Sequence, residues 1–256
     1  MILAIDVGNT NIVMGVINEG KIIFVERLST NHKKTELEYA LDINNVLSMY
    51  NIKTTDIDGG IIASVVPLLT DIIKLSVNKV CNFDPFIVGP GIKTGVNIRL
   101  DNPAEIGADR VAEAVAVISE YEGSALIIDM GTANTISVID ENKNIIGGLI
   151  MPGILISLEA LTENASQLID INVEPPKEII GKNTKDCMKS GVVYGNAAMI
   201  DGLISRIEKS CGKFNSIIAT GGLSKLIIPY CEHMIIHDED LLLKGLWIMY
   251  KKNKKD

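Results

Sequence analysis

The sequence contains only four cysteines and three histidines, which limits the covalent and metal chemistry that it can support. No two cysteines are close in the chain, whereas disulfide frameworks and zinc sites need clustered spacings. His233 and His237 are separated by Met-Ile-Ile, which is typical of a strand, and no third ligand is nearby. We therefore expect reduced thiols and no metal site built on histidine.

Long apolar runs and a basic charge balance are also missing. No stretch reaches the roughly 18–20 apolar residues of a membrane-spanning helix, and the apolar N-terminal segment contains Asp6 without the basic start of a signal peptide. The net charge of −8 and the pI near 5.0 oppose binding to nucleic-acid phosphates. The basic tail at residues 251–255 is interpreted as a solvated helix end. We expect a cytoplasmic protein that binds neither membranes nor nucleic acids.

The sequence does contain an internal repeat. Its 256 residues, 47% hydrophobic and 22% charged, suit one large or two small globular domains. Residues 2–17 consist of an apolar run, Asp-x-Gly-Asn-Thr-Asn and a second apolar run, and residues 125–139 repeat this order around Asp-x-Gly-Thr-Ala-Asn-Thr. Each copy continues into a third apolar segment, at 21–28 and 145–151. The pattern predicts two related three-stranded meanders, with chance similarity as the alternative.

After each meander the spacing of apolar residues alternates between helical and strand-like. Helices are predicted at 34–50, 68–80, 109–121 (with a start near Pro103), 154–168, 186–211 and 240–252, and strands at 59–67, 86–89, 216–222 and 234–237. This order is typical of an α/β fold in which helices cover mixed sheets. We expect domains at 1–118 and 119–256, with the last helix able to return to the first domain.

The repeated acidic turns are the first candidates for a binding site. Asp6 and Asp129 each end a predicted buried strand, where a carboxylate is unfavourable unless it is paired, hydrogen-bonded or bound to a cation. The glycine that follows lets the backbone approach a ligand closely. The turn amides and the hydroxyls of Thr10 and Thr132 can then bind an anion. Two facing turns would hold a polyphosphate and its Mg²⁺; the alternative is an Asx turn that satisfies only its own backbone.

Other nucleotide motifs are absent or ambiguous. No G-x-x-x-x-G-K-[ST] or G-x-G-x-x-G motif is present, and residues 181–184 lack the upstream glycine of a phosphate-binding loop. Residues 220–223 (Thr-Gly-Gly-Leu) end a strand and open a short helix, which suits contact with a phosphate or a base. A plain strand-to-helix turn would look the same.

The polar segment Gly107-Ala108-Asp109-Arg110 opens a helix near the domain junction. Asp109 could act as a general base for a substrate hydroxyl, and Arg110 could hold an anionic group of the substrate. An ion pair on the helix surface is the alternative.

Taken together, these motifs resemble the type III pantothenate kinases over essentially the whole chain. The motifs that carry the resemblance are 6–11 (DVGNTN), 107–110 (GADR), 129–135 (DMGTANT), 147–148 (GG) before 151–153 (MPG), 181–184 (GKNT), 220–223 (TGGL) and 243–246 (LKGL). This family belongs to the actin-like ATPase, or acetate-and-sugar-kinase, superfamily. The resemblance therefore implies duplicated ribonuclease-H-like domains, each a mixed β-sheet flanked by helices.

The resemblance implies transfer of a phosphoryl group from ATP to the primary hydroxyl of pantothenate, the first step of coenzyme A biosynthesis, with Mg²⁺ and K⁺ or NH₄⁺, in a homodimer. It places ATP at Asp6, Val7, Gly8, Asn9, Thr10, Asn11, Ile12, Val13 and Thr132. It places pantothenate at Gly107, Ala108, Asp109, Arg110 and, across the dimer interface, Thr184. Asp109 is implied as the proton acceptor and Asp129 as the ligand of the monovalent cation. Leu100 stands where the family often has a tyrosine that contacts pantothenate, so that role is not carried over.

Three other functions use similar sequence features. A kinase of another small alcohol would share the domains and differ around Gly107–Arg110. A regulatory or accessory ATP-binding protein would bind nucleotide without turnover that depends on pantothenate. A chaperone or filament ATPase is disfavoured because this chain has no room for extra subdomains.

Overall fold

The computed structural model describes residues 1–254, so Lys255 of the basic tail lies outside the described residues. The chain divides into two compact units. Unit 1 contains Met1–Val96, Asp101–Glu120 and the segment from Asp240 onward, and unit 2 contains Asn97–Leu100 and Tyr121–Glu239. Compared with the expected division between residues 118 and 119, residues 97–100 belong to unit 2, and residues 119–120 and the last helix belong to unit 1.

Unit 1 is built on a mixed five-stranded sheet with the order β3-β2-β1-β4-β5. Its strands are β1 (Ile2–Val7), β2 (Asn11–Asn18), β3 (Lys21–Ser29), β4 (Gly59–Ser64) and β5 (Phe86–Ile87). The first three form the predicted antiparallel meander, whereas β4 pairs parallel with β1 and β5. Glu19 and Gly20 make the β2–β3 turn with φ of 49° and 86°, a conformation that glycine adopts at little cost.

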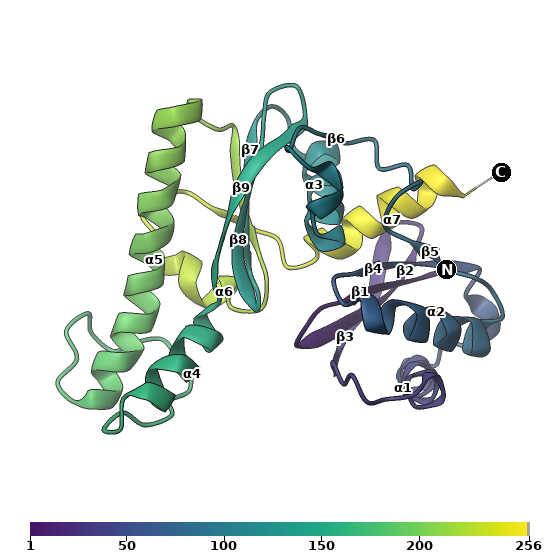
Figure 1. Cartoon of the computed structure of the whole chain (residues 1–256), viewed down its shortest axis with the longest axis horizontal. Helices are drawn as coiled ribbons and strands as arrows, with labels where there is room; N and C mark the ends of the chain where they lie inside the picture. Colours follow the sequence, from purple (N-terminus) through teal and green to yellow (C-terminus); the bar gives the residue numbers. More distant parts are fainter. Residues whose placement is uncertain (255–256) are drawn as a thin grey trace. The chain divides into compact units, whose positions relative to one another are not determined.

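The described residues of unit 1 form four α-helices: α1 (Glu36–Met49), α2 (Pro67–Cys81), α3 (Ala108–Glu120) and α7 (Leu241–Asn253). A capping box between Thr35 and Glu38 starts α1, and Pro67 occupies the first turn of α2. In Figure 1, α1 and α2 lie on one side of this sheet and α7 on the other.

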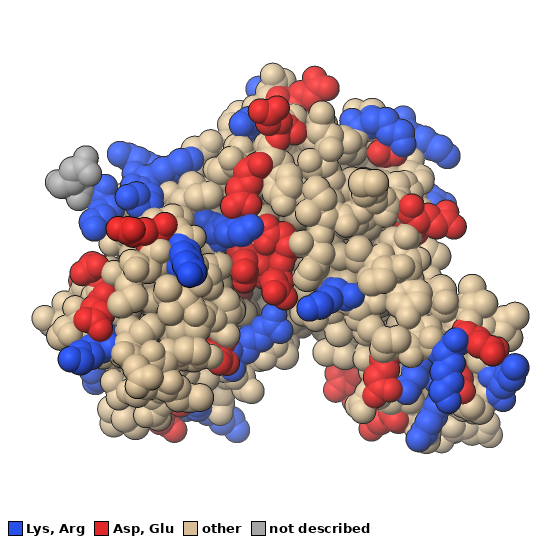
Figure 2. Space-filling model, turned by 180° about the vertical axis from the view of Figure 1, so that it is seen from behind, with Lys and Arg blue, Asp and Glu red and all other residues tan. Residues whose placement is uncertain are grey.

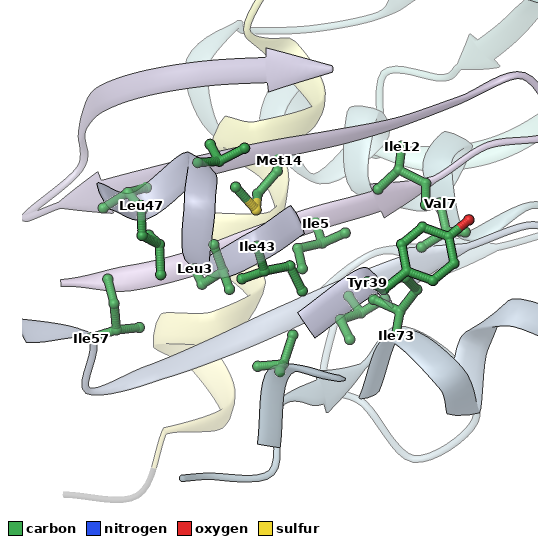
Figure 3. Close-up of a cluster of buried hydrophobic side chains, with 14 of the residues drawn as sticks. Leu3, Ile5, Val7, Ile12, Met14, Tyr39, Ile43, Leu47, Ile57 and Ile73 are labelled. Carbon is green, nitrogen blue, oxygen red and sulfur yellow. The ribbon is translucent and has the colours of Figure 1, made fainter. Parts of the chain in front are cut away.

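The core of unit 1 fixes which way the side chains of β1 point. Figure 3 shows Leu3, Ile5 and Val7 in one cluster with Tyr39 and Ile43 of α1. Neighbouring residues of a strand point to opposite faces of the sheet, so Asp6 points away from this core.

The opposite face of the sheet is the one covered by α7. A Cβ on Gly15, which pairs with Ala4 of β1, would lie 2.8 Å from Leu243 Cδ1, and a Cβ on Gly59 would collide with the Tyr250 ring. Missing side chains at these glycines therefore make room for α7 on the face to which Asp6 points.

Unit 2 repeats this architecture. Its strands are β7 (Ala125–Met130), β8 (Ala133–Ile139), β9 (Asn144–Pro152), β10 (Ser216–Thr220), β11 (Ile236–His237) and β6 (Asn97–Ile98), in the order β11-β10-β7-β8-β9-β6. Without β6, this is the strand order of unit 1, with β7–β9 as the meander and β10 parallel to β7. Its helices are α4 (Ile154–Asn164), α5 (Thr184–Cys211) and the short α6 (Ser224–Ile227), and α5 runs along one face of the sheet (Figure 1).

Several boundaries differ from the predicted ones. Pro103 begins a separate 3₁₀ turn, Pro103–Glu105, because the Asn102 side chain accepts from the Ala104 amide and the chain then breaks before α3. The predicted helix at 154–168 ends at Asn164. The two-residue strand β6 lacks any apolar alternation and was not predicted.

The length of the apolar helices and the distribution of charged side chains can be described for residues 1–254. None of their helices is both long and apolar enough to cross a membrane. Figure 2 shows acidic and basic side chains interspersed within each unit on the face drawn there, so on that face the net charge of −8 is not gathered in one patch.

Candidate active site

The first acidic turn is a tight loop at the end of β1. Asp6 and Val7 pair with Val13 and Ile12, which leaves Gly8, Asn9 and Thr10 to close the hairpin. The Gly8 amide donates to the Asn11 carbonyl at 3.0 Å, and a Cβ on Gly8 would lie 2.9 Å from that oxygen. Glycine is therefore required by a close backbone approach.

Thr30, which the sequence did not single out, anchors this loop. Its hydroxyl donates to the Gly8 carbonyl at 2.7 Å, and its amide donates to the Thr10 carbonyl at 3.0 Å. Both carbonyls are thus bonded from the β3 side, which holds the loop against the end of β3. An ordinary threonine just after a strand carries no signal of this role in the sequence.

Asp109 lies beside the strand ends that carry the first acidic turn. The Val65 amide, just after β4, donates to the Val7 carbonyl at 3.1 Å. A Cβ on Gly107 would lie 3.4 Å from Val65 Cγ1 and 2.3 Å from Asp109 Oδ1. The Asp109 carboxylate therefore folds over Gly107, next to the ends of β1 and β4.

The environment of Asp109 tunes its ionisation. Burial raises the pKa of this carboxyl above its ordinary value, and the Arg110 amide, which donates to Oδ1 at 2.7 Å, and the positive charge of Arg110 offset part of that effect. A carboxylate with a raised pKa is a stronger proton acceptor, provided that it stays ionised at neutral pH.

The second acidic turn has the same frame and a shorter loop. Asp129 pairs with Thr135 and Met130 with Asn134, so that only Gly131 and Thr132 close the hairpin. Gly153, at the start of α4, packs against this loop, since a Cβ there would lie 2.1 Å from the Thr132 carbonyl oxygen. Gly153, the last residue of the Met-Pro-Gly motif, therefore packs directly against the backbone of the second acidic turn.

The turn after β10 completes the surroundings of Asp129. Thr220 pairs with Asp129, and Gly221 follows with φ of 90°. A Cβ on Gly221 would lie 2.3 Å from Asp129 Oδ1 and 2.6 Å from the Met130 backbone. The Thr-Gly-Gly-Leu motif, ambiguous in the sequence, therefore packs directly against the carboxylate.

Thr184 occupies a different place in unit 2. It is the first residue of α5 and is exposed, and the preceding Asn183 caps the helix by accepting from the Asp186 amide at 3.0 Å. The structure thus brings the predicted residues together in two groups, one around Asp6 and Asp109 in unit 1 and one around Asp129 and Thr132 in unit 2. That the two groups act on one nucleotide stays a prediction.

Two units with the same strand order, each with an acidic hairpin turn at the end of its central strand, define the actin-like ATPase class of phosphotransferase folds. The activator of 2-hydroxyisocaproyl-CoA dehydratase from Clostridium difficile, solved with bound ADPNP, has this fold at 13% identity, with a TM-score of 0.57 and coverage of 100% of this chain and 98% of that one. The predicted fold class is confirmed.

Sequence comparison narrows the class to one family. The family model for type III pantothenate kinase matches residues 2–206. A type III pantothenate kinase of Halalkalibacterium halodurans is 45% identical over 253 residues, which span 99% of this chain and 100% of the relative. One of an Exiguobacterium species is 42% identical over 255 residues, 100% of both chains. The chain belongs to the type III pantothenate kinase family.

Proposed function

We propose that this protein catalyses the ATP-dependent phosphorylation of pantothenate to 4′-phosphopantothenate, the first step of coenzyme A biosynthesis. The observation that carries the proposal is the position of Asp109. Its half-buried carboxylate lies beside the acidic loop of β1 in a chain whose full-length relatives are type III pantothenate kinases.

Asp109 accepts the proton of the primary hydroxyl as the oxygen attacks the γ-phosphorus of ATP. The O–H bond breaks toward the Asp109 carboxylate, the new P–O bond forms, and the bond to the β-phosphate oxygen breaks to release ADP. Arg110 and the backbone at Gly107 and Ala108 hold the pantothenate. Since phosphoryl transfer proceeds through a loose transition state, positioning and charge neutralisation dominate catalysis.

The residues present fit the expected cations. Mg²⁺ is commonly held by one or two carboxylates, with water and substrate phosphates as its other ligands. Among residues 1–254 no group of three or more His, Cys, Asp or Glu side chains gathers as a metal cage. Asp6 would hold Mg²⁺ through its waters, and bound Mg²⁺ would neutralise phosphate charge.

Asp129 would hold the monovalent cation. Its carboxylate lies in a cradle of glycines, where a Cβ on Gly131 would be 3.3 Å from Oδ2 and one on Gly221 would be 2.3 Å from Oδ1. The missing side chains let the backbone of both turns approach this carboxylate closely, which suits a small site for one ion. The ATP contacts are assigned to residues 6–13 and to Thr132 in the second acidic turn.

The proposal includes a cytoplasmic homodimer. Thr184 would complete the pantothenate site of the partner subunit, and the exposed Ile179 and Ile180, 64% and 75% accessible, precede it in the chain. Large exposed apolar side chains next to an implied interface residue support burial against a second copy. The four free cysteines suit the reducing conditions of the cytoplasm.

The test is an assay of ADP release coupled to a dye-linked readout. We expect release to depend on pantothenate, to need Mg²⁺, and to rise when K⁺ replaces Na⁺. A panel of small alcohols and sugars in place of pantothenate distinguishes a kinase of another acceptor. Nucleotide binding without pantothenate-dependent ADP release would contradict the proposal and favour an accessory ATP-binding role.

A further inference from the structure

A short chain of hydrogen bonds in unit 2 ends on the glycine turn beside Asp129. His237 Nε2 lies 3.0 Å from Ser224 Oγ, and Ser224 Oγ lies 2.6 Å from the Gly221 carbonyl oxygen. The Ser224 amide also donates to this carbonyl, at 3.2 Å. Ser224 is fully buried, so its hydroxyl cannot exchange these partners for water.

The direction of the hydrogen bonds follows from the proton count. A carbonyl oxygen only accepts, so the single hydroxyl proton of Ser224 is donated to Gly221. The Ser224 oxygen is then left as an acceptor, and His237 must supply a proton from Nε2. The neutral ring therefore carries its proton on Nε2, and the protonated ring keeps the same donor.

These bonds fix the orientation of one peptide unit. Carbonyl and amide point in opposite directions across a planar trans peptide. When Ser224 holds the Gly221 carbonyl, the amide N–H of Gly222 is directed away from Ser224. Gly221 itself is held at φ of 90° against Asp129 and Met130. Without a restraint, a Gly-Gly peptide would rotate easily, because neither residue carries a Cβ.

We propose that Ser224 and His237 are positioning residues that lock the Gly221–Gly222 peptide so that its amide is presented to the bound nucleotide. This inference rests on the proposed use of ATP and extends it to two residues that do not themselves contact the nucleotide. The strand register supports it, because β11 pairs with β10 so that His237 lies opposite Ala219, two residues before the turn glycine. The pairing of β11 with β10 thus places the ring of His237 within hydrogen-bond distance of Ser224, next to the Gly221 turn.

The experiment measures nucleotide binding directly, by titration calorimetry with Mg-ATP in the absence of pantothenate. Ser224→Ala and His237→Leu are expected to weaken ATP binding by about five- to tenfold, the effect of one lost hydrogen bond of a preorganised group. His237→Gln places an amide N–H near the position of Nε2 and is expected to bind ATP within about twofold of the unmodified protein. In turnover assays, the KM for ATP rises and the KM for pantothenate does not.

His233→Leu is the matched control. It removes a histidine of the same unit, whose Nδ1 lies 2.7 Å from Asp201 Oδ1 and which has no hydrogen bond to the turn. We expect it to lower stability and leave ATP affinity unchanged. Equal ATP affinity in Ser224→Ala and the unmodified protein, or an equal loss in His237→Gln and His237→Leu, would overturn the inference. ATP binding with the expected pattern but without pantothenate turnover would instead contradict only the proposed reaction.

Discussion

The two acidic turns share one frame but differ in what lies beside them. Each aspartate is the second-to-last residue of a central strand that pairs antiparallel with the next strand and parallel with a later one. Beside Asp6 the parallel strand offers Ala63, and the chain continues into the long helix α2. Beside Asp129 it offers Thr220, and the chain turns sharply at Gly221.

Because of this difference, the two related acidic turns have different neighbouring residues and can bind different groups. In unit 1 the segment after β4 lies against Gly107, so the first turn is next to the half-buried carboxylate of Asp109. In unit 2 the segment after β10 closes over Asp129 itself. On the proposed assignment, the first copy would serve the acceptor together with ATP and Mg²⁺, and the second would serve the monovalent cation and ATP. Substitutions in the two turns should therefore have different effects.

The largest expected effect is that of Asp109→Asn. It should lower kcat by ~10²–10⁴, as expected for a lost general base, because the amide cannot accept the hydroxyl proton. Binding of Mg-ATP, measured by calorimetry, should be unchanged. Near-normal turnover in this variant would remove Asp109 from the catalytic role.

Asp109 also gives a pH prediction. Its pKa is raised in the folded protein, so the folded state binds this proton more tightly than the unfolded chain, and ionisation costs stability above the unfolded pKa. Asp109→Asn should therefore melt at a higher temperature than the unmodified protein at pH 7. The difference should vanish near pH 3, where both states are protonated. Equal melting temperatures at pH 7 would contradict the raised pKa.

Asp129→Ala should remove the activation by K⁺ and lower turnover on the order of 10–100-fold, the effect of a lost charge-stabilising cation. Asp6→Ala is the counterpart in the other turn and should raise the Mg²⁺ concentration needed for activity. Titrations of K⁺ at fixed Mg²⁺, and of Mg²⁺ at fixed K⁺, separate the two variants. An unchanged K⁺ titration in Asp129→Ala would show that the two turns are not divided in this way.

Gly221→Ala should lower the free energy of unfolding by ~2–3 kcal/mol, because strain at positive φ adds to a collision with Asp129. Gly91 is the control, since it has a φ of 93° and open space around its missing side chain. Gly91→Ala should cost only about 1 kcal/mol. Equal losses in urea denaturation would mean that the contact with Asp129 adds nothing.

The smallest effect concerns the cysteines. Burial raises the pKa of Cys81 to about 11, and burial together with the charge of Asp201 raises that of Cys231 to about 12. Cys187 and Cys211 are exposed. Since thiolates react and thiols do not, iodoacetamide at pH 8 should label only Cys187 and Cys211 in the native protein. Unit 1, whose single cysteine is Cys81, should stay unlabelled in peptide mass spectra.

Much of the fold was predictable because its signals are local. The two meanders follow from apolar runs separated by Gly and Asn turns, and α1, α2, α5 and α7 follow from helical spacing. The short strand β6 was not predictable, because a two-residue pairing depends on the position of β9 and not on its own sequence.

The site was predictable to the extent that it resides in unusual residues. Asp6 and Asp129 stood out because carboxylates at the ends of apolar strands need a reason, and Asp109 stood out as part of a polar segment that opens a helix. Thr30 and Val65 did not stand out, because their contacts to the first turn arise only when distant strands pair. The role of Gly221 needed the register of β10 against β7, which the motif alone does not contain.

The return of α7 to unit 1 has a consequence for the order of folding during synthesis. Gly245 packs on the Ala112 carbonyl of α3, where a Cβ would lie at 1.8 Å, and Leu243 fills the space above Gly15. The residues of unit 1 that precede unit 2 in the chain therefore lack the packing of α7 until that helix has been synthesised. Because unit 2 is nearly contiguous in the chain, we expect it to complete its folding first. Until α7 packs, the sheet of unit 1 exposes an apolar face, which chaperones would bind.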